Sequence, residues 1–299
     1  MRRLSDDRGA VAVLVALIMV PLLVCTALVI DMGAGYVRKR QLQNAADAAV
    51  LAVAQDCAAG TCGSISTTAT NYTNQNVPGV TATATPVLIG TSSARVTTSS
   101  VVNFSFAPVI GVNQQTVTAT ATATWGTPVG GTAVLPLAFS WCAFNAQANG
   151  GIPAPVTPYK IYTSKGDGTT CHGPSGNDVP GGFGWLDIDP GSACSTTTSL
   201  SNIVTSNTGN AQPCSDSFFT SQLNKTVLLP VYDSYTGNGN NGSYHIYAYA
   251  AFHLTDFNFG GAKKNYLEGY FTSFVDVSDA FTYGTGNTDT GTKIISLTN

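Results

Sequence analysis

Charged residues are scarce in this chain of 299 residues and account for only 10% of it. Ordinary soluble proteins contain roughly 25%. Between residues 61 and 159 the only charged residue is Arg95. The formal net charge is −3, so the chain lacks the basic surface with which proteins bind nucleic acid. The composition therefore excludes nucleic acid as an expected partner.

Residue types used in catalysis are also few. The chain has three His residues, and Glu268 is its only Glu. It contains no Gly-x-Ser-x-Gly nucleophile motif, phosphate-binding loop, His-Glu-x-x-His helix or dinucleotide-binding fingerprint. We therefore expect no enzyme activity and no cofactor.

Three groups of polar residues remain as candidate sites, and each lacks something that its chemistry needs. Asp187 and Asp189 would share one face of an extended segment, but a calcium site needs more oxygen ligands. His245 and His253 are an even number of residues apart in an apolar run, so both would lie on one face of a strand, but a zinc site needs a further ligand. His172 adjoins Cys171, which would offer no thiolate nucleophile if it is bridged. We predict no metal site and no catalytic residue.

One long apolar run, Ala10 to Ile30, contains no charged residue. As a helix it would be about 31 Å long, close to the hydrocarbon thickness of a bilayer. A cleaved secretory signal has a shorter apolar core, and a lipoprotein signal would need a small residue where Val24 precedes Cys25. We predict a retained, single-pass anchor in the lipid bilayer, with Pro21 tolerated inside the span.

The basic residues around this run do not decide its orientation. Arg2, Arg3 and Arg8 precede it, but the cluster 38–40 follows it closely, so the positive-inside rule is nearly balanced. Outside the span there are six cysteines: Cys57, Cys62, Cys142, Cys171, Cys194 and Cys214. An even set fits three disulfides in an oxidising compartment, and the alternative is six free thiols in a reducing cytosol. We expect a cytoplasmic amino terminus and an extracytoplasmic carboxy-terminal part.

Six cysteines allow fifteen pairings, and sequence alone does not choose among them. Their order along the chain suggests the pairs 57–62, 142–171 and 194–214.

Helix-forming residues continue beyond Asp31, with Gly33 and Gly35 as the weak points. Small residues recur at helical spacing, which produces a narrow face at Ala45, Ala48, Ala49, Ala52 and Val53. We predict that residues 48–53 pack on the chain's own sheet, and the alternative is a partner helix.

Residues 80–89, 95–106 and 116–125 are rich in β-branched residues and predict three strands. Gly126 to Gly131 predicts a boundary. Beyond it, apolar runs at 134–139, 159–163, 226–232, 244–254 and 270–277 predict a second β domain, with long loops at 164–182 and 191–216.

The predicted fold class is α+β: a transmembrane helix continues into a pilin-like helix with an antiparallel sheet, and a mainly β, disulfide-stapled domain follows. The predicted domains are 1–60, 61–129 and 130–299.

Five aromatic residues lie beside Gly or Asn turns, namely Phe183, Trp185, Tyr232, Tyr235 and Tyr283. Exposed rings at such turns could meet a sugar, a pilus subunit or a second copy. The alternative is that they belong to the core of the second domain.

The residues around the apolar run resemble a known family. The positions that carry the resemblance are Gly9, Pro21, Asp31, Gly33, Tyr36, Gln43, Ala46 and Asp47. In this order they look like the amino-terminal domain of TadG-like proteins, which belong to the Tad (Flp, tight-adherence) pilus-assembly systems. The resemblance covers roughly residues 8–55.

This resemblance implies a bacterial membrane protein that assembles with other Tad pilus or secretion components. Two family features are absent. Leu14 stands where prepilin-peptidase substrates have Glu, so we expect no such processing, and Asp276-Val277-Ser278-Asp279 lacks the second Ser of a von Willebrand A-type metal site. The alternative function is an anchored cell-surface module that binds an envelope glycan or host ligand. The oligomeric state is not predicted.

Overall fold

The computed structural model describes residues 8–149, 151–153, 157–163, 168–200, 202–205, 213–237, 242–260, 265–277, 279–284 and 288–298. The chain divides into two compact units. Unit 1 comprises Met1–Val53, Gly63–Ala123 and Leu297–Asn299, and unit 2 comprises Ala54–Cys62 and Thr124–Ser296.

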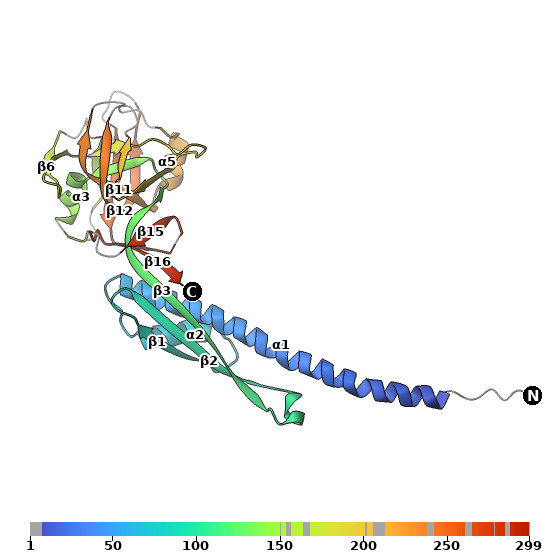
Figure 1. The fold of residues 1–299 in the computed structure, drawn as a ribbon. Helices are drawn as coiled ribbons and strands as arrows, with labels where there is room; N and C mark the ends of the chain where they lie inside the picture. The colour runs from blue at the N-terminus through green and yellow to red at the C-terminus, as the bar shows by residue number, and fades with distance from the viewer. Residues whose placement is uncertain are drawn as a thin grey trace, which may run out of the picture. The chain divides into compact units, whose positions relative to one another are not determined.

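A single helix, α1, runs from Arg8 to Ala58 (Figure 1). It contains the apolar run and the Ala-rich segment after it, which confirms the expected continuous helix. Pro21 lies inside α1, as expected for a helix whose neighbouring turns tolerate the missing hydrogen bond. Among the residues of the small-residue face, Ala49, Ala52 and Val53 are buried whereas Ala48 is half-buried.

Unit 1 packs the middle of α1 against an antiparallel sheet. The strands are β1 (Thr83–Leu88), β2 (Ser93–Asn103) and β3 (Gln114–Ala133), and they confirm the three expected strands. β1 pairs with β2 from Thr83↔Ser99 to Leu88↔Ala94. On β2 every second residue from Ala94 to Val102 is buried, so one face of this strand contributes to the core.

Small side chains bring α1 close to this sheet. Leu42 and Ala45 of α1 share a buried cluster with Ala119 of β3. The hydroxyl of Thr98 donates to the Leu42 carbonyl at 2.9 Å, and both groups are buried. The helix is therefore held on the sheet by apolar packing and by a side-chain hydrogen bond to its backbone.

The sequence did not predict helix α2 (Ile65–Asn76), which also belongs to unit 1. Its residues are mostly Thr and Asn, which have low helix propensity. Ser64 caps its amino terminus by accepting the N–H of Thr67. This cap was the one sequence signal for the helix.

Residues 126–131, expected to form a boundary, instead lie within β3. Here β3 pairs with β15 (Phe281–Gly284) and with β9 (Thr196–Ser199). A Cβ atom on Gly126 would lie 2.5 Å from the Gly284 carbonyl oxygen. These glycines therefore allow close strand approach, which is a role that the sequence cannot distinguish from a turn.

Unit 2 contains a second sheet, in the order β5–β13–β12–β11–β4–β8, with β10 on β12. Its strands are β4 (Leu137–Ser140), β5 (Tyr159–Tyr162), β8 (Phe183–Trp185), β10 (Ile203–Thr205), β11 (Thr226–Thr236), β12 (Ser243–Asn258) and β13 (Tyr266–Thr272). β11 and β12 form an antiparallel pair from Thr226↔His253 to Thr236↔Ser243. The five apolar runs beyond residue 130 thus all contribute strands.

The remaining elements are shorter. They are helices α3 (Trp141–Ala148) and α5 (Asp216–Gln222) and strands β6 (Thr170–His172), β7 (Asp178–Pro180), β14 (Phe274–Asp276) and β16 (Thr292–Thr298). The expected long loops at 164–182 and 191–216 are therefore wrong in part, because they contain β6, β7, β9, β10 and the start of α5. Strands of three or four residues are too short to show a period of two. Residues 164–167, 201 and 206–212 of these segments lie outside the described residues.

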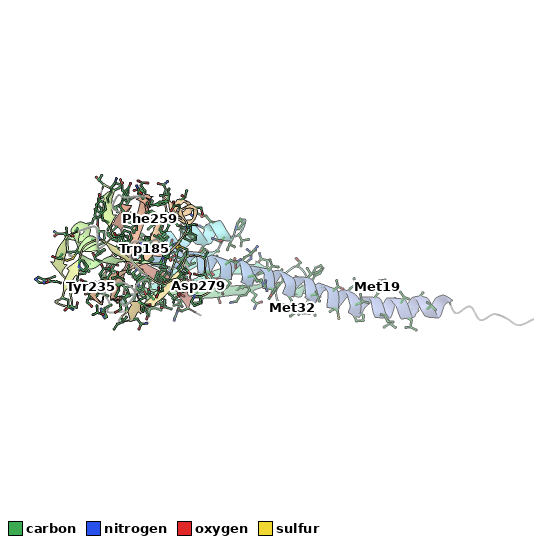
Figure 2. The ribbon with its side chains drawn as sticks, turned by 90° about the horizontal axis from the view of Figure 1, so that it is seen from above. Met19, Met32, Trp185, Tyr235, Phe259 and Asp279 are labelled. Atoms are coloured by element: carbon green, nitrogen blue, oxygen red, sulfur yellow. A yellow bond between two sulfur atoms is a disulfide. The ribbon has the colours of Figure 1, made fainter. Side chains whose placement is uncertain are left out.

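Aromatic rings form the core of unit 2. The Phe139 ring lies 4.7 Å from that of Phe252 and 5.0 Å from that of Phe271, measured between centroids. Trp185 lies 5.2 Å from Phe259, and Figure 2 shows both among the side chains of unit 2. These edge and tilted contacts are the arrangements that aromatic pairs prefer.

The buried phenol of Tyr249 shows how this core accommodates polar atoms. Its hydroxyl lies 2.7 Å from that of Thr198. Burial raises the pKa of Tyr249 to about 12, although the Thr198 hydrogen bond acts in the opposite direction. The phenol therefore remains neutral at physiological pH.

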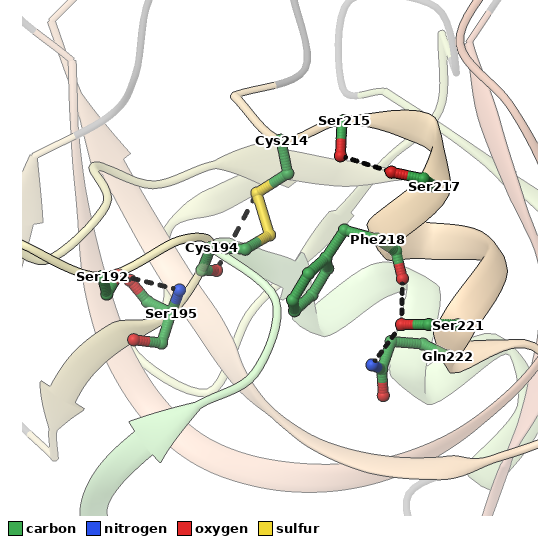
Figure 3. The surroundings of a disulfide bond; sticks show 9 residues. All are labelled: Ser192, Cys194, Ser195, Cys214, Ser215, Ser217, Phe218, Ser221 and Gln222. Carbon is green, nitrogen blue, oxygen red and sulfur yellow. Dashed lines mark hydrogen bonds between the residues drawn. A yellow bond between two sulfur atoms is a disulfide. The ribbon is translucent and has the colours of Figure 1, made fainter.

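The structure confirms the three suggested disulfides, which join Cys57 to Cys62, Cys142 to Cys171 and Cys194 to Cys214. The bond between Cys194 and Cys214 connects the segment before β9 to the start of α5 (Figure 3). Close by, Phe218 packs against the core cluster of unit 2. The bridges therefore restrain the segments that carry the shortest elements.

Candidate functional site

The apolar run of α1 is a candidate membrane span in the structure as well as in the sequence. In the described part of the chain, α1 is the one helix long and apolar enough to cross a bilayer. Residues 11–30 are exposed except for the half-buried Ala27, and Figure 2 shows Met19 projecting from the bare helix. An apolar helix surface without protein around it favours an apolar solvent, which supports anchoring by a single span.

Asp31 ends this span and has three backbone partners. Its carboxylate accepts the N–H groups of Ser105, Phe106 and Ala107 at 2.9, 2.9 and 2.6 Å. The side chain is only 4% exposed. These donors lie at the start of the short 3-10 helix η1 (Ala107–Ile110), where backbone N–H groups have no partner within the helix. Asp31 therefore fastens the turn between β2 and β3 to the end of the span.

That turn is apolar, although hairpin turns are ordinarily polar. Val109 is 90% exposed and Ile110 is 68% exposed, and Phe106 and Val112 are exposed as well. We call residues 104–113 the hairpin tip. In Figure 1 the hairpin lies alongside α1 and extends beyond the rest of the sheet.

A groove of about 410 Å³ separates the hairpin tip from the span. One wall is α1 between Leu23 and Ile30, and the other is formed by Phe106, Ala107, Val109 and Ile110. Thr26 is the one polar residue in the lining, and its hydroxyl donates to the Leu22 carbonyl at 2.8 Å. The groove is therefore an apolar surface without a free side-chain donor.

The basic cluster after the span makes contacts within unit 1. Lys39 donates to the Thr118 carbonyl of β3. Arg40 donates through Nε to the Tyr36 hydroxyl at 2.9 Å, and its guanidinium carbon lies 5.1 Å from the centre of that ring. Two of the three cations are thus used within the fold.

The residues that carry the family resemblance have distinct places. Gln43 bridges the carboxylate of Asp47 at 2.9 Å and the Thr120 carbonyl at 3.3 Å, and Ala46 is fully buried. Gly9, Pro21 and Gly33 lie within α1, and a Cβ atom on Gly33 would meet nothing within 4 Å. Of these positions, Gln43 contacts the sheet and Asp31 contacts the hairpin tip.

The polar candidates of unit 2 brace strands. Asp187 accepts the Thr205 hydroxyl at 2.6 Å, and Asp189 accepts the N–H and hydroxyl of Thr197 at 3.0 and 2.7 Å. The two carboxylates have different hydrogen-bond partners and share none. Their contacts hold short strands that have few ladder bonds of their own.

The three histidines have separate partners. Nδ1 of His245 lies 2.7 Å from the buried carboxylate of Asp233. Nδ1 of His172 lies 2.8 Å from the exposed carboxylate of Asp178. His253 shares a hydrogen bond with Thr226 and stacks on Tyr270. Among the described residues no group of three or more His, Cys, Asp and Glu is placed to hold a metal ion. Ser278 of the Asp276–Asp279 string lies outside the described residues.

The candidate aromatic surface is wrong for most of its members. Phe183, Trp185 and Tyr232 are buried in the core, which leaves Tyr235 exposed and Tyr283 partly buried. Tyr283 shares a hydrogen bond with the Thr124 hydroxyl. A turn beside an aromatic residue did not indicate exposure here, because the rings of β8 and β11 pack into the core cluster of unit 2.

Comparison with known proteins identifies the anchor region. Residues 9–56 match the family described as putative Flp pilus-assembly TadE/G-like. No curated protein and no solved structure matches the chain. The matched range includes the span, Asp31 and the part of α1 that packs on the sheet. Residues 9–56 are therefore similar to the Flp pilus-assembly TadE/G-like family.

Proposed function

We propose that this protein is an extracytoplasmic, membrane-anchored component of a Tad/Flp-type pilus assembly or adhesion system. Its role there is structural rather than enzymatic. The match of residues 9–56 carries the proposal, because it covers the anchor and the part of α1 that organises unit 1. The partners are the lipid bilayer and other Tad pilus or secretion components.

The disulfides all lie in unit 2 and support an extracytoplasmic place for it, and the sheet of unit 1 would lie on the same side because it follows the same span. Three bonds form from six cysteines, and such frameworks persist in oxidising compartments. The cluster 38–40 leaves the positive-inside rule nearly balanced, so the disulfides carry the inference of orientation. We infer that the amino terminus is cytoplasmic and that the chain crosses the membrane once.

The alternative, a glycan- or ligand-binding surface module, has less support. It depended on aromatic side chains at turns, and three of the five are buried. Tyr235 alone does not form a stacking surface.

The orientation predicts the behaviour of a reporter fused after Asn299. Alkaline phosphatase at this position should be active, because its own disulfides form only outside the cytoplasm. The same fusion without residues 10–30 provides the control and should be inactive. If the phosphatase is inactive and a reporter that fluoresces only in the cytoplasm is fluorescent at the same position, the orientation is the opposite of the one proposed. The assembly role is tested separately, by counting pili on cells that lack the protein.

A further inference from the structure

The hairpin tip has a feature that an exposed loop in water does not need. Seven of its nine backbone N–H groups bond to partners inside the protein. Asp31 accepts three of them, from Ser105, Phe106 and Ala107. The Phe104 N–H bonds to the Asn113 carbonyl. The N–H of Val109 bonds to the Phe106 carbonyl, that of Gly111 to the Pro108 carbonyl, and that of Val112 to the Ala107 carbonyl.

Such pairing is the condition for non-helical backbone at membrane depth. In hydrocarbon no water is present to satisfy a free N–H or carbonyl group, so irregular backbone is stable there only when its polar groups are bonded internally. Pro108 removes a further donor from the tip. The N–H groups of the tip are therefore largely satisfied without water, as an apolar solvent requires.

The side chains of the tip agree with its backbone. Val109 and Ile110 are the most exposed of them, and no charged residue lies between Phe104 and Asn113. The polar residues Asn103 and Asn113 mark where the apolar segment begins and ends. An exposed apolar patch on a folded protein marks a membrane or protein contact.

The position of the tip along α1 sets its depth. The groove reaches Leu23, which is eight residues before Asp31 and therefore about 12 Å deeper along the helix. Half of the hydrocarbon layer is about 15 Å. The tip thus lies beside the part of α1 that occupies the leaflet next to unit 1.

We propose that the hairpin tip is a second membrane-inserted element, and that the groove between it and the span holds an acyl chain of a phospholipid. This inference rests on the single-pass anchor and not on the pilus role or on the orientation.

The depth and the lining of the groove favour an acyl chain over another helix. Thr26 is the one polar residue of the lining and its hydroxyl is bonded to the Leu22 carbonyl, so no side-chain donor in the groove is free to bind a partner protein. A helix is about 10 Å across. A single hydrocarbon chain is narrower, and the groove is continuous with the lipid around the span.

Spin labels measure whether the tip is in lipid. The full chain is placed in phospholipid nanodiscs with Cys25→Ala, which removes the one cysteine outside the three disulfides. A label at Val109→Cys is compared with one at Val20→Cys in the span and one at Val87→Cys on β1. These three valines are 90%, 63% and 52% exposed, so each tolerates a label. Val87 pairs with Arg95, at the end of β2 away from the tip.

The Val109 label should collide with oxygen several-fold more than with a water-soluble nickel chelate, as the Val20 label does. The Val87 label should show the reverse preference. A Val109 label with the accessibility of Val87 would overturn the insertion.

Photo-crosslinking identifies the occupant of the groove. A benzophenone amino acid at Leu28, which lines the groove and is 42% exposed, is activated in nanodiscs of one synthetic phosphatidylethanolamine. We expect the main product to have the mass of the chain plus one lipid. In a second experiment the lipid carries the photoactivatable group on its acyl chain, and we expect Ala27→Phe to reduce labelling of the tip several-fold. A main product of two crosslinked chains would show that a second copy fills the groove and would overturn the lipid assignment.

Discussion

Replacement of Phe139 by Ala should destabilise unit 2 by about 3–5 kcal/mol, the range measured for buried Phe or Trp truncations. Phe139 is fully buried and its ring contacts those of Phe183, Phe252 and Phe271. These neighbours belong to three different strands, so the cavity would lie where β8, β12 and β13 meet. Strands that already have partners cannot collapse fully into such a cavity. The loss of unfolding free energy should therefore lie in the upper part of this range.

Tryptophan fluorescence is a suitable readout, because Trp125, Trp141 and Trp185 all belong to unit 2. Urea titration of the full chain in detergent therefore reports the unfolding of this unit. Tyr235→Ala is the matched control, since this aromatic is 47% exposed and should change the unfolding free energy by less than about 0.5 kcal/mol. Equal effects of the two substitutions would contradict the assignment of the core.

Asp31→Asn should detach the hairpin tip from α1 without unfolding the sheet. The carboxylate accepts three N–H groups through two oxygens. An Asn amide has one acceptor oxygen, and its NH₂ group would face a backbone donor. At least one N–H at 105–107 would then be unsatisfied, and in an apolar environment that favours an opened turn.

Hydrogen–deuterium exchange of a peptide covering residues 104–112 measures this effect. We expect the amides of residues 105–107 to exchange at least ten-fold faster in the variant, and those of β2 to be unchanged. Asp47→Asn is the control, because its side-chain oxygen can still accept from Gln43. Unchanged protection at 105–107 in Asp31→Asn would refute the role given to this carboxylate.

The sequence predicted those parts of the fold that depend on local pattern. Composition and length indicated the span, helix propensity indicated the continuation of α1, and β-branched runs indicated β1, β2 and β3. The disulfide pairs followed the order of the cysteines because the bridges close short segments, with separations of 5, 29 and 20 residues. Each of these features is encoded close to where it forms.

Features that depend on distant contacts were missed. Asp31 was noted as the end of the span, but its partners lie 74 to 76 residues away, and no local pattern connects them. The glycines of β3 suggested a boundary because their role, close approach to β15, exists only in the folded sheet. The apolar Phe-Ala-Pro-Val-Ile-Gly-Val segment at 106–112 was a usable signal, since turns between strands are rarely so apolar.

The assembly role is tested most directly by deletion in a bacterium that makes Flp pili. Pili are counted by electron microscopy in the deletion strain, and in strains complemented with the wild-type chain or with a chain lacking residues 10–30. We predict that pili fall at least several-fold on deletion and return only with the anchored chain. Normal pilus number and adhesion in the deletion strain would contradict the account.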